Sequence, residues 1–132
     1  MSLEEKLDRI TEDTATSVGQ LREMVAHFVG ERDWKQFHAP KNISMALAIE
    51  AAELMEHFQW ITVEASREDL PPEKRAAIGE EIADVLCYAM ALANEMDFDI
   101  ATLMREKMKK NVQKYPAQEF RGRYGKDDPP KA

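Results

Sequence analysis

The chain has 132 residues, of which 44% are hydrophobic and 33% are charged, and its formal net charge is −7. This length and composition suit one globular domain, and the acidic balance argues against a protein that binds polymeric nucleic acid through a basic surface. The one cysteine, Cys87, excludes an intrachain disulfide, and the sequence has neither a signal-peptide pattern nor an apolar run long enough to cross a bilayer. We therefore expect a cytoplasmic protein with no membrane partner.

Two capping signals predict helices near the N-terminus. Ser2 and Glu5 have capping-box spacing, and the apolar stripe around them predicts a short helix that would be marginal by itself. Ser17 and Gln20 repeat the signal, and the apolar face that follows predicts a helix ending near Gly30. The stripe of the first helix consists of Leu3, Leu7 and Ile10.

A polar and aromatic segment, ERDWKQFHAPKN, follows this helix. Because Pro40 disfavours a continuing helix, residues 31–42 are predicted to form a loop, and loops on rigid scaffolds often carry binding groups. Asn42 is then expected to cap a second long helix that runs to about Ala65. The aromatic side chains of the loop are Trp34, Phe37 and His38.

The third long helix is unusually apolar. Leu70-Pro71-Pro72 is a helix-start signal, and the helix should run to about Met96. From residue 82 to residue 93 its one charged side chain is Asp84, so it should be covered on nearly all sides. Four short helices of one chain cannot easily do this, which predicts a homo-oligomer.

A fourth helix is predicted over roughly 100–114, capped by Asp97 or Asp99 and ended by Tyr115 and Pro116. No segment alternates like an amphipathic strand, so the predicted fold class is all-α. The expected division is an N-terminal helical extension (1–16), a helical domain (17–116) and a flexible C-terminal tail (117–132).

Two pairs of acids interrupt the apolar faces of these helices. Glu50 and Glu53 lie three residues apart in ALAIEAAELMEHFQW, and Glu81 and Asp84 repeat the spacing on the next long helix. Such spacing places both carboxylates of a pair on one face of a helix. If the two helices pack antiparallel, the four carboxylates can converge on an oxygen-only site, which suits magnesium or manganese.

Other interpretations of these acids must be weighed. A single E-x-x-E pair is more often a solvated helix face, but two pairs in apolar context favour a metal site. A carboxylate-bridged di-iron site needs Glu-x-x-His on two helices. His57 lies four residues after Glu53 and no second copy exists, so the spacing excludes that site.

Taken together, these motifs resemble the MazG-like superfamily of all-α nucleoside triphosphate pyrophosphohydrolases. The resemblance lies in E-x-x-E followed by E-x-x-D on consecutive helices, with FQW closing the first and YP ending the last. The ERDWKQFHAPKN segment resembles the dCTP pyrophosphatase-like branch, and the similarity spans about Leu21–Pro116. It implies a four-helix MazG-like bundle, here with an additional short N-terminal helix, completed by oligomerisation into a dimer or a dimer-of-dimers tetramer.

The resemblance also implies an activity. Its members cleave a nucleoside triphosphate between the α and β phosphates, which here suggests dCTP or a modified pyrimidine dNTP and a role in nucleotide-pool sanitation. The implied cofactor is Mg²⁺, with Mn²⁺ as a substitute, because such a metal neutralises phosphate charge and activates water. The implied metal ligands and catalytic residues are Glu50, Glu53, Glu81 and Asp84, with Glu53 as the candidate base. The rival hypothesis is a catalytically silent helical module that binds nucleotide or a protein partner.

Substrate contacts follow from the same resemblance, since a nucleobase needs stacking faces and a few polar edges. Without it, Phe37 and Trp60 could equally be core aromatics and Tyr88 an ordinary helix residue. The cationic face of the last helix implies phosphate contacts, although it also suits the helix dipole. The implied contacts are Trp34, Lys35, Gln36, Phe37, His38, Trp60 and Tyr88, with Lys107 and Asn111 at the phosphates.

Overall fold

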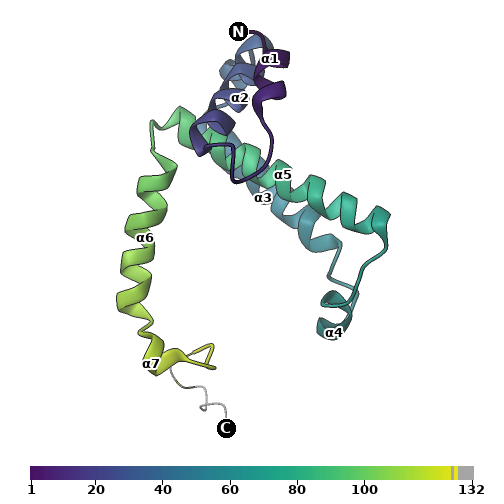
Figure 1. The fold of residues 1–132 in the computed structure, drawn as a ribbon, viewed down its shortest axis with the longest axis vertical. Helices are drawn as coiled ribbons and strands as arrows, with labels where there is room; N and C mark the ends of the chain where they lie inside the picture. Colours follow the sequence, from purple (N-terminus) through teal and green to yellow (C-terminus); the bar gives the residue numbers. More distant parts are fainter. Residues whose placement is uncertain (126, 128–132) are drawn as a thin grey trace. The chain divides into compact units, whose positions relative to one another are not determined.

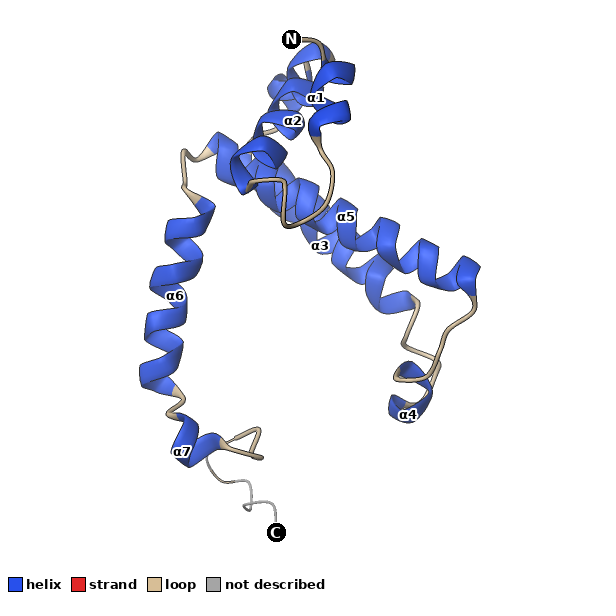
Figure 2. Ribbon diagram, in the orientation of Figure 1, coloured by secondary structure: helices blue, strands red, loops and turns tan. Residues whose placement is uncertain are grey.

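Helices form the regular structure of the described part of the chain, residues 1–125 and 127, in this computed structural model (Figures 1 and 2). The predicted all-α class is confirmed. The chain divides into two bodies, Met1–Phe98 and Asp99–Ala132. The first contains α1 (Leu3–Arg9), α2 (Val18–Glu31), the 3₁₀ helix η1 (Trp34–Phe37), α3 (Pro40–Glu56), α4 (Val63–Ser66) and α5 (Pro72–Glu95). The second contains α6 (Ile100–Lys114) and α7 (Ala117–Phe120).

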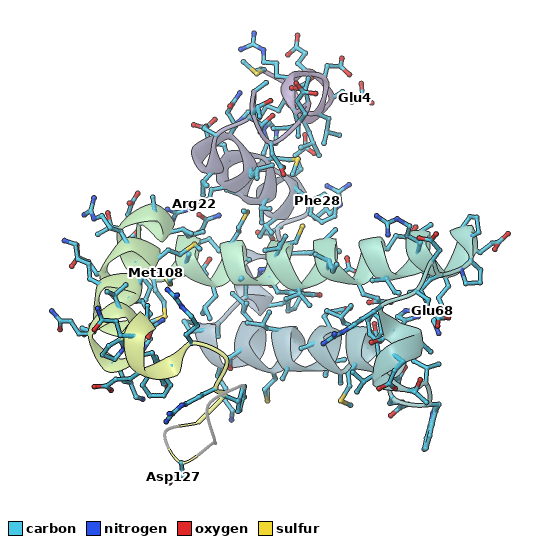
Figure 3. The ribbon with its side chains drawn as sticks, turned by 60° about the horizontal axis from the view of Figure 1, so that its bottom comes forward. Glu4, Arg22, Phe28, Glu68, Met108 and Asp127 are labelled. Atoms are coloured by element: carbon cyan, nitrogen blue, oxygen red, sulfur yellow. The ribbon has the colours of Figure 1, made fainter. Side chains whose placement is uncertain are left out.

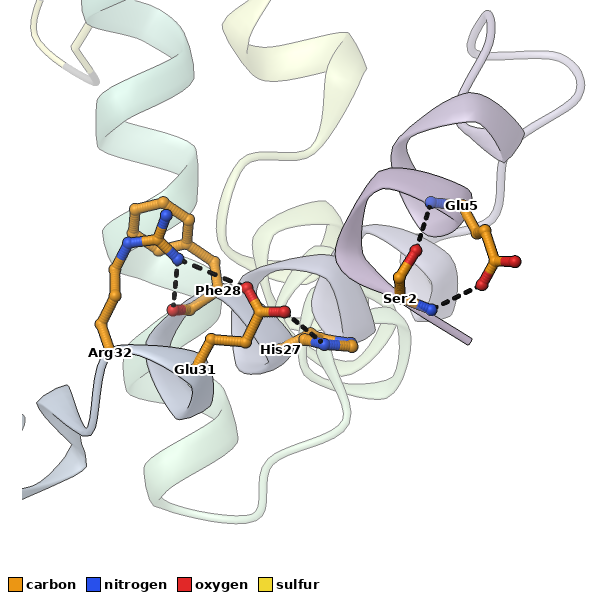
Figure 4. Close-up of polar contacts among 6 residues, drawn as sticks. All are labelled: Ser2, Glu5, His27, Phe28, Glu31 and Arg32. Carbon is orange, nitrogen blue, oxygen red and sulfur yellow. Dashed lines mark hydrogen bonds and ion pairs between the residues drawn. The ribbon is translucent and has the colours of Figure 1, made fainter.

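Reciprocal capping boxes begin both α1 and α2, as predicted. The Ser2 hydroxyl accepts a hydrogen bond from the Glu5 backbone N–H at 3.1 Å, and the Glu5 carboxylate accepts one from the Ser2 N–H (Figure 4). Ser17 and Gln20 repeat the arrangement at 3.1 and 2.8 Å. Each box satisfies two backbone donors that a helix N-terminus otherwise leaves without partners.

The antiparallel pair of α3 and α5 is the scaffold of the first body. The two helices run side by side and are joined at one end through the segment that contains α4 (Figure 1). Ile43 of α3, only 2% exposed, packs with Val25 of α2 and Ala91 of α5 in the buried core. Two hydrogen bonds also join α2 to α5. The Arg22 side chain donates to the Asn94 side-chain oxygen at 2.9 Å, and the Asn94 amide donates to the Arg22 carbonyl at 3.2 Å (Arg22 is labelled in Figure 3).

The predicted bounds of α3 are wrong at both ends. The helix begins at Pro40, because proline at the first helical position loses no hydrogen bond, and the Asn42 amide instead donates to the Phe37 carbonyl at 3.2 Å. It ends at Glu56 rather than near Ala65. There the backbone tightens into i to i−3 hydrogen bonds, and Thr62 caps the separate helix α4 by accepting from a backbone N–H.

The later helices agree with the prediction in position. Asp99, not Asp97, caps α6, and its carboxylate accepts from the Thr102 N–H at 3.0 Å. The expected C-terminal tail includes the short helix α7, and its Phe120 ring meets the ring of Tyr115, at the end of α6, edge to face at 5.2 Å. Residues 126 and 128–132 of that tail lie outside the described residues, and the domain division stays a prediction. None of the described helices combines the length and the apolar character that crossing a membrane requires.

Candidate active site

Three of the four predicted acids converge between α3 and α5. One carboxylate oxygen from each of Glu50, Glu53 and Glu81 lies within 4.8 Å of the other two. The Oε2 atoms of Glu50 and Glu81 are buried and have no hydrogen-bond partner among the described residues. Buried acceptors without partners cost free energy, and carboxylate oxygens are the ligands that hard divalent cations prefer. The residues present therefore fit a metal ion, and this cluster could hold one.

The electrostatics of the cluster point the same way. Burial, a hydrogen bond with the Glu53 side chain and the charges of the neighbouring acids together raise the pKa of Glu50 to about 7. Asp84 is one of those charges, so the fourth predicted acid acts on the cluster although it is outside the group of three. A bound cation would relieve this repulsion and favour the ionised form.

A pocket of about 540 Å³ lies in the same body, lined from α1, α2, η1 and α5 and by His38. This volume is within the range of small-molecule sites. The lining contains Asp84 together with three predicted substrate contacts, Trp34, His38 and Tyr88. Asp84 thus connects the pocket with the acid cluster. The other lining residues are Leu3, Leu7, Met24, Val25, Phe28, Val29, Cys87 and Ala91.

Contacts between α2 and η1 position the aromatic wall of this pocket. The Trp34 ring meets the Phe28 ring edge to face at 5.6 Å. The Arg32 guanidinium lies 3.8 Å from the centre of the Phe28 ring and donates to the Phe28 carbonyl (Figure 4). The Gln36 amide donates to the Asp33 carbonyl and to the Asp33 carboxylate, both at 3.0 Å. Asp33 itself has a positive φ of 52°. Gln36 therefore holds the shape of the turn that presents Trp34.

The sequence did not predict Phe28 as part of this wall, nor the Arg32 side chain that packs on the Phe28 ring. Phe28 belongs to the apolar stripe of α2, and a stripe indicates burial without distinguishing a core from a ligand pocket. Arg32 lies four residues after Phe28, but it belongs to the segment predicted as a loop, so the sequence did not indicate that the two side chains pair on one helix face.

The remaining predicted contacts do not line this pocket. Phe37 is 61% exposed and Trp60 87% exposed, so neither belongs to the core of the single chain. Lys35 is also exposed. Lys107 and Asn111 belong to α6 in the second body, where the Asn111 amide lies 3.8 Å from the Met108 sulfur. Gln36 is also absent from the lining. Substrate contact stays a prediction for these six residues and for the three that line the pocket.

The fold and site define an all-α protein with a carboxylate cluster that could hold a metal ion and a ligand-sized pocket that Asp84 lines. The model of the MazG-like family matches residues 45–126, which include both acid pairs. The chain belongs to the MazG-like family.

Relatives and a solved structure agree with this membership. The chain is 44% identical to mouse dCTP pyrophosphatase 1 over 103 residues, which are 77% of this chain and 61% of the relative. It is 44% identical to human dCTP pyrophosphatase 1 over 98 residues, 74% of this chain and 58% of the relative. The matches thus span about three fifths of these relatives. The crystal structure of a pyrophosphatase from Archaeoglobus fulgidus has a TM-score of 0.71 and 32% identity, covering 81% of this chain and 98% of that one. The resemblance to the dCTP pyrophosphatase-like branch is confirmed.

Proposed function

We propose that this chain is a nucleoside triphosphate pyrophosphohydrolase that converts dCTP or a modified pyrimidine dNTP to the monophosphate and pyrophosphate. The observation that carries the proposal is the cluster of Glu50, Glu53 and Glu81, with two buried oxygens lacking partners, next to a pocket that Asp84 also lines. Similarity to dCTP pyrophosphatase 1 over most of this chain supports the choice of substrate. Such an activity serves nucleotide-pool sanitation in the cytoplasm.

The acids would hold Mg²⁺, with Mn²⁺ as a substitute, through Glu50, Glu53, Glu81 and Asp84. When bound, the cation supplies neutralisation of the phosphate charge and a more acidic water. Glu53 is positioned to accept a proton from that water, since its carboxylate belongs to the cluster. Glu81 contributes the second helix of the site, so the separation of α3 and α5 sets the spacing of the ligands.

The pocket would hold the nucleoside. Trp34 and Tyr88 offer aromatic faces, and the His38 ring offers a polar edge for a base. Asp84 lines the pocket and its charge acts on Glu50, so the phosphates would reach the metal site past Asp84. Phe37, Trp60, Lys107 and Asn111 are proposed as further contacts, the last two to phosphate oxygens.

A homo-oligomer is part of the proposal. Apolar side chains on both scaffold helices are exposed in the single chain, which favours burial against another copy. Dimer and tetramer are distinguished by light scattering after gel filtration. The exposed apolar side chains of α3 and α5 include Met45, Ile49, Met55, Ile82 and Leu86.

Pyrophosphate release from a panel of dNTPs with Mg²⁺ tests the activity directly. We expect the highest kcat/KM for dCTP or a 5-substituted dCTP and no release in EDTA. Glu53→Gln serves as the inactive control because it keeps the shape of the side chain. A folded protein that binds dCTP but releases no pyrophosphate from any dNTP would overturn the enzyme and favour a silent nucleotide-binding module.

A further inference from the structure

The N-terminal helix α1 forms part of the wall of the pocket. Leu3 and Leu7, one helical turn apart, both line it together with Trp34, His38 and Tyr88. Leu7 is still 47% exposed, as expected for a side chain that faces an open pocket rather than a core. Helix α1 precedes residues 45–126, so the family match does not account for this wall.

Helix α1 is held where it can act on a ligand. A helix of seven residues is too short to be stable by itself, and here it depends on its capping box and on packing against α2. Its C-terminal end is closed by the backbone N–H of Ile10, which donates to the Leu7 carbonyl at 3.0 Å. Leu7, which lines the pocket, thus belongs to the closed last turn of the helix.

We propose that Leu3 and Leu7 are specificity-determining residues, which limit the pocket to a pyrimidine-sized base and give it an apolar wall. The inference rests on the proposed function. A methyl or other apolar substituent on the base would gain contact with this wall, whereas a second ring would collide with it. Shortening either leucine removes apolar contact and enlarges the pocket at the same time.

Steady-state kinetics of Leu7→Ala and of the Leu3→Ala/Leu7→Ala pair provide the main test. For Leu7→Ala the KM for dCTP should rise about five- to tenfold, because roughly half of a leucine's burial is lost, while kcat changes little. The preference for dCTP over dATP should fall by a similar factor. Asp8→Asn, on the same helix but outside the pocket lining, should match the wild type.

A second variant enlarges the Leu7 side chain instead of shortening it, which controls for the case in which shortening Leu7 unfolds α1. Leu7→Phe keeps an apolar residue on α1 and adds bulk to the wall. It should raise KM for 5-methyl-dCTP more than for dCTP. If both variants melt like the wild type and keep its KM values and its dCTP to dATP preference, the inference is overturned.

Labelling of Cys87 supplies a readout that needs no turnover. It is the chain's one cysteine and lines the same pocket. A dCTP analogue with a methylene between the α and β phosphates should slow its reaction with N-ethylmaleimide. The double leucine variant should need several times more analogue for equal protection, and equal protection in both proteins would overturn the inference. A wild type that is protected but releases no pyrophosphate refutes the proposed activity alone.

Discussion

The raised pKa of Glu50 in the acid cluster predicts how strongly magnesium binding depends on pH. The folded pKa of Glu50 is about 7, above its ordinary value of 4.5. Without metal, the stability that this raised pKa contributes is complete below pH 4.5 and is lost as the pH rises through about 7. Metal binding needs the ionised carboxylate, so the stabilisation by magnesium must increase over the same interval.

The size of the pH effect on magnesium affinity follows from the ionised fraction of the Glu50 carboxyl. With a pKa of about 7, roughly nine tenths of Glu50 is ionised at pH 8 and roughly one tenth at pH 6. The apparent Kd for Mg²⁺ should therefore rise about tenfold between pH 8 and pH 6. A Mg²⁺ concentration of about 100 times the Kd at pH 8 is then only about ten times the Kd at pH 6, so magnesium should raise the melting temperature less at pH 6 than at pH 8.

Calorimetric titration of EDTA-treated protein at the two pH values measures this, with thermal melts as a second readout. Glu50→Gln should bind magnesium more weakly at both values and lose most of the pH dependence, because the residue that titrates is gone. A Kd that is the same at pH 6 and pH 8, or a melt that magnesium does not shift, would refute the account of the cluster.

Three substitutions test separate parts of the structure. Glu53→Gln should reduce kcat at least about 100-fold while leaving the melting temperature in EDTA unchanged or higher, and a fully active variant would remove Glu53 from the mechanism. Trp34→Ala should raise the KM for dCTP about tenfold with a smaller change in kcat, which kinetics at saturating magnesium can measure; an unchanged KM would place the base elsewhere. Ile43→Ala, at a site 2% exposed, should cost about 2–5 kcal/mol in urea unfolding, and a cost below 1 kcal/mol would mean that the core is not centred there.

Local signals in the sequence predicted most of the helices and the acid cluster. Capping by Ser2 and Ser17 depends on residues three positions away, so spacing alone identifies it. The convergence of Glu50 and Glu81 follows from helical periodicity and from a connection that returns the chain antiparallel.

What the sequence did not predict depends on three-dimensional packing. The apolar stripe of α3 continues in sequence to Phe58 and Ile61, but the backbone turns after Glu56 because tight hydrogen bonds and the Thr62 cap replace the helix. Leu7 and Phe28 belong to apolar helix faces, and such a face can pack in a core or line a ligand pocket. Only the three-dimensional structure shows that these two side chains line the pocket.

Hydrolysis of dCTP in water enriched in ¹⁸O tests the central claim most directly, because it reports which phosphorus the site presents to the attacking water. With magnesium bound at the acids of α3 and α5, the account predicts that the label enters dCMP and that pyrophosphate is unlabelled. Label in pyrophosphate, or release of inorganic phosphate with dCDP, would contradict it.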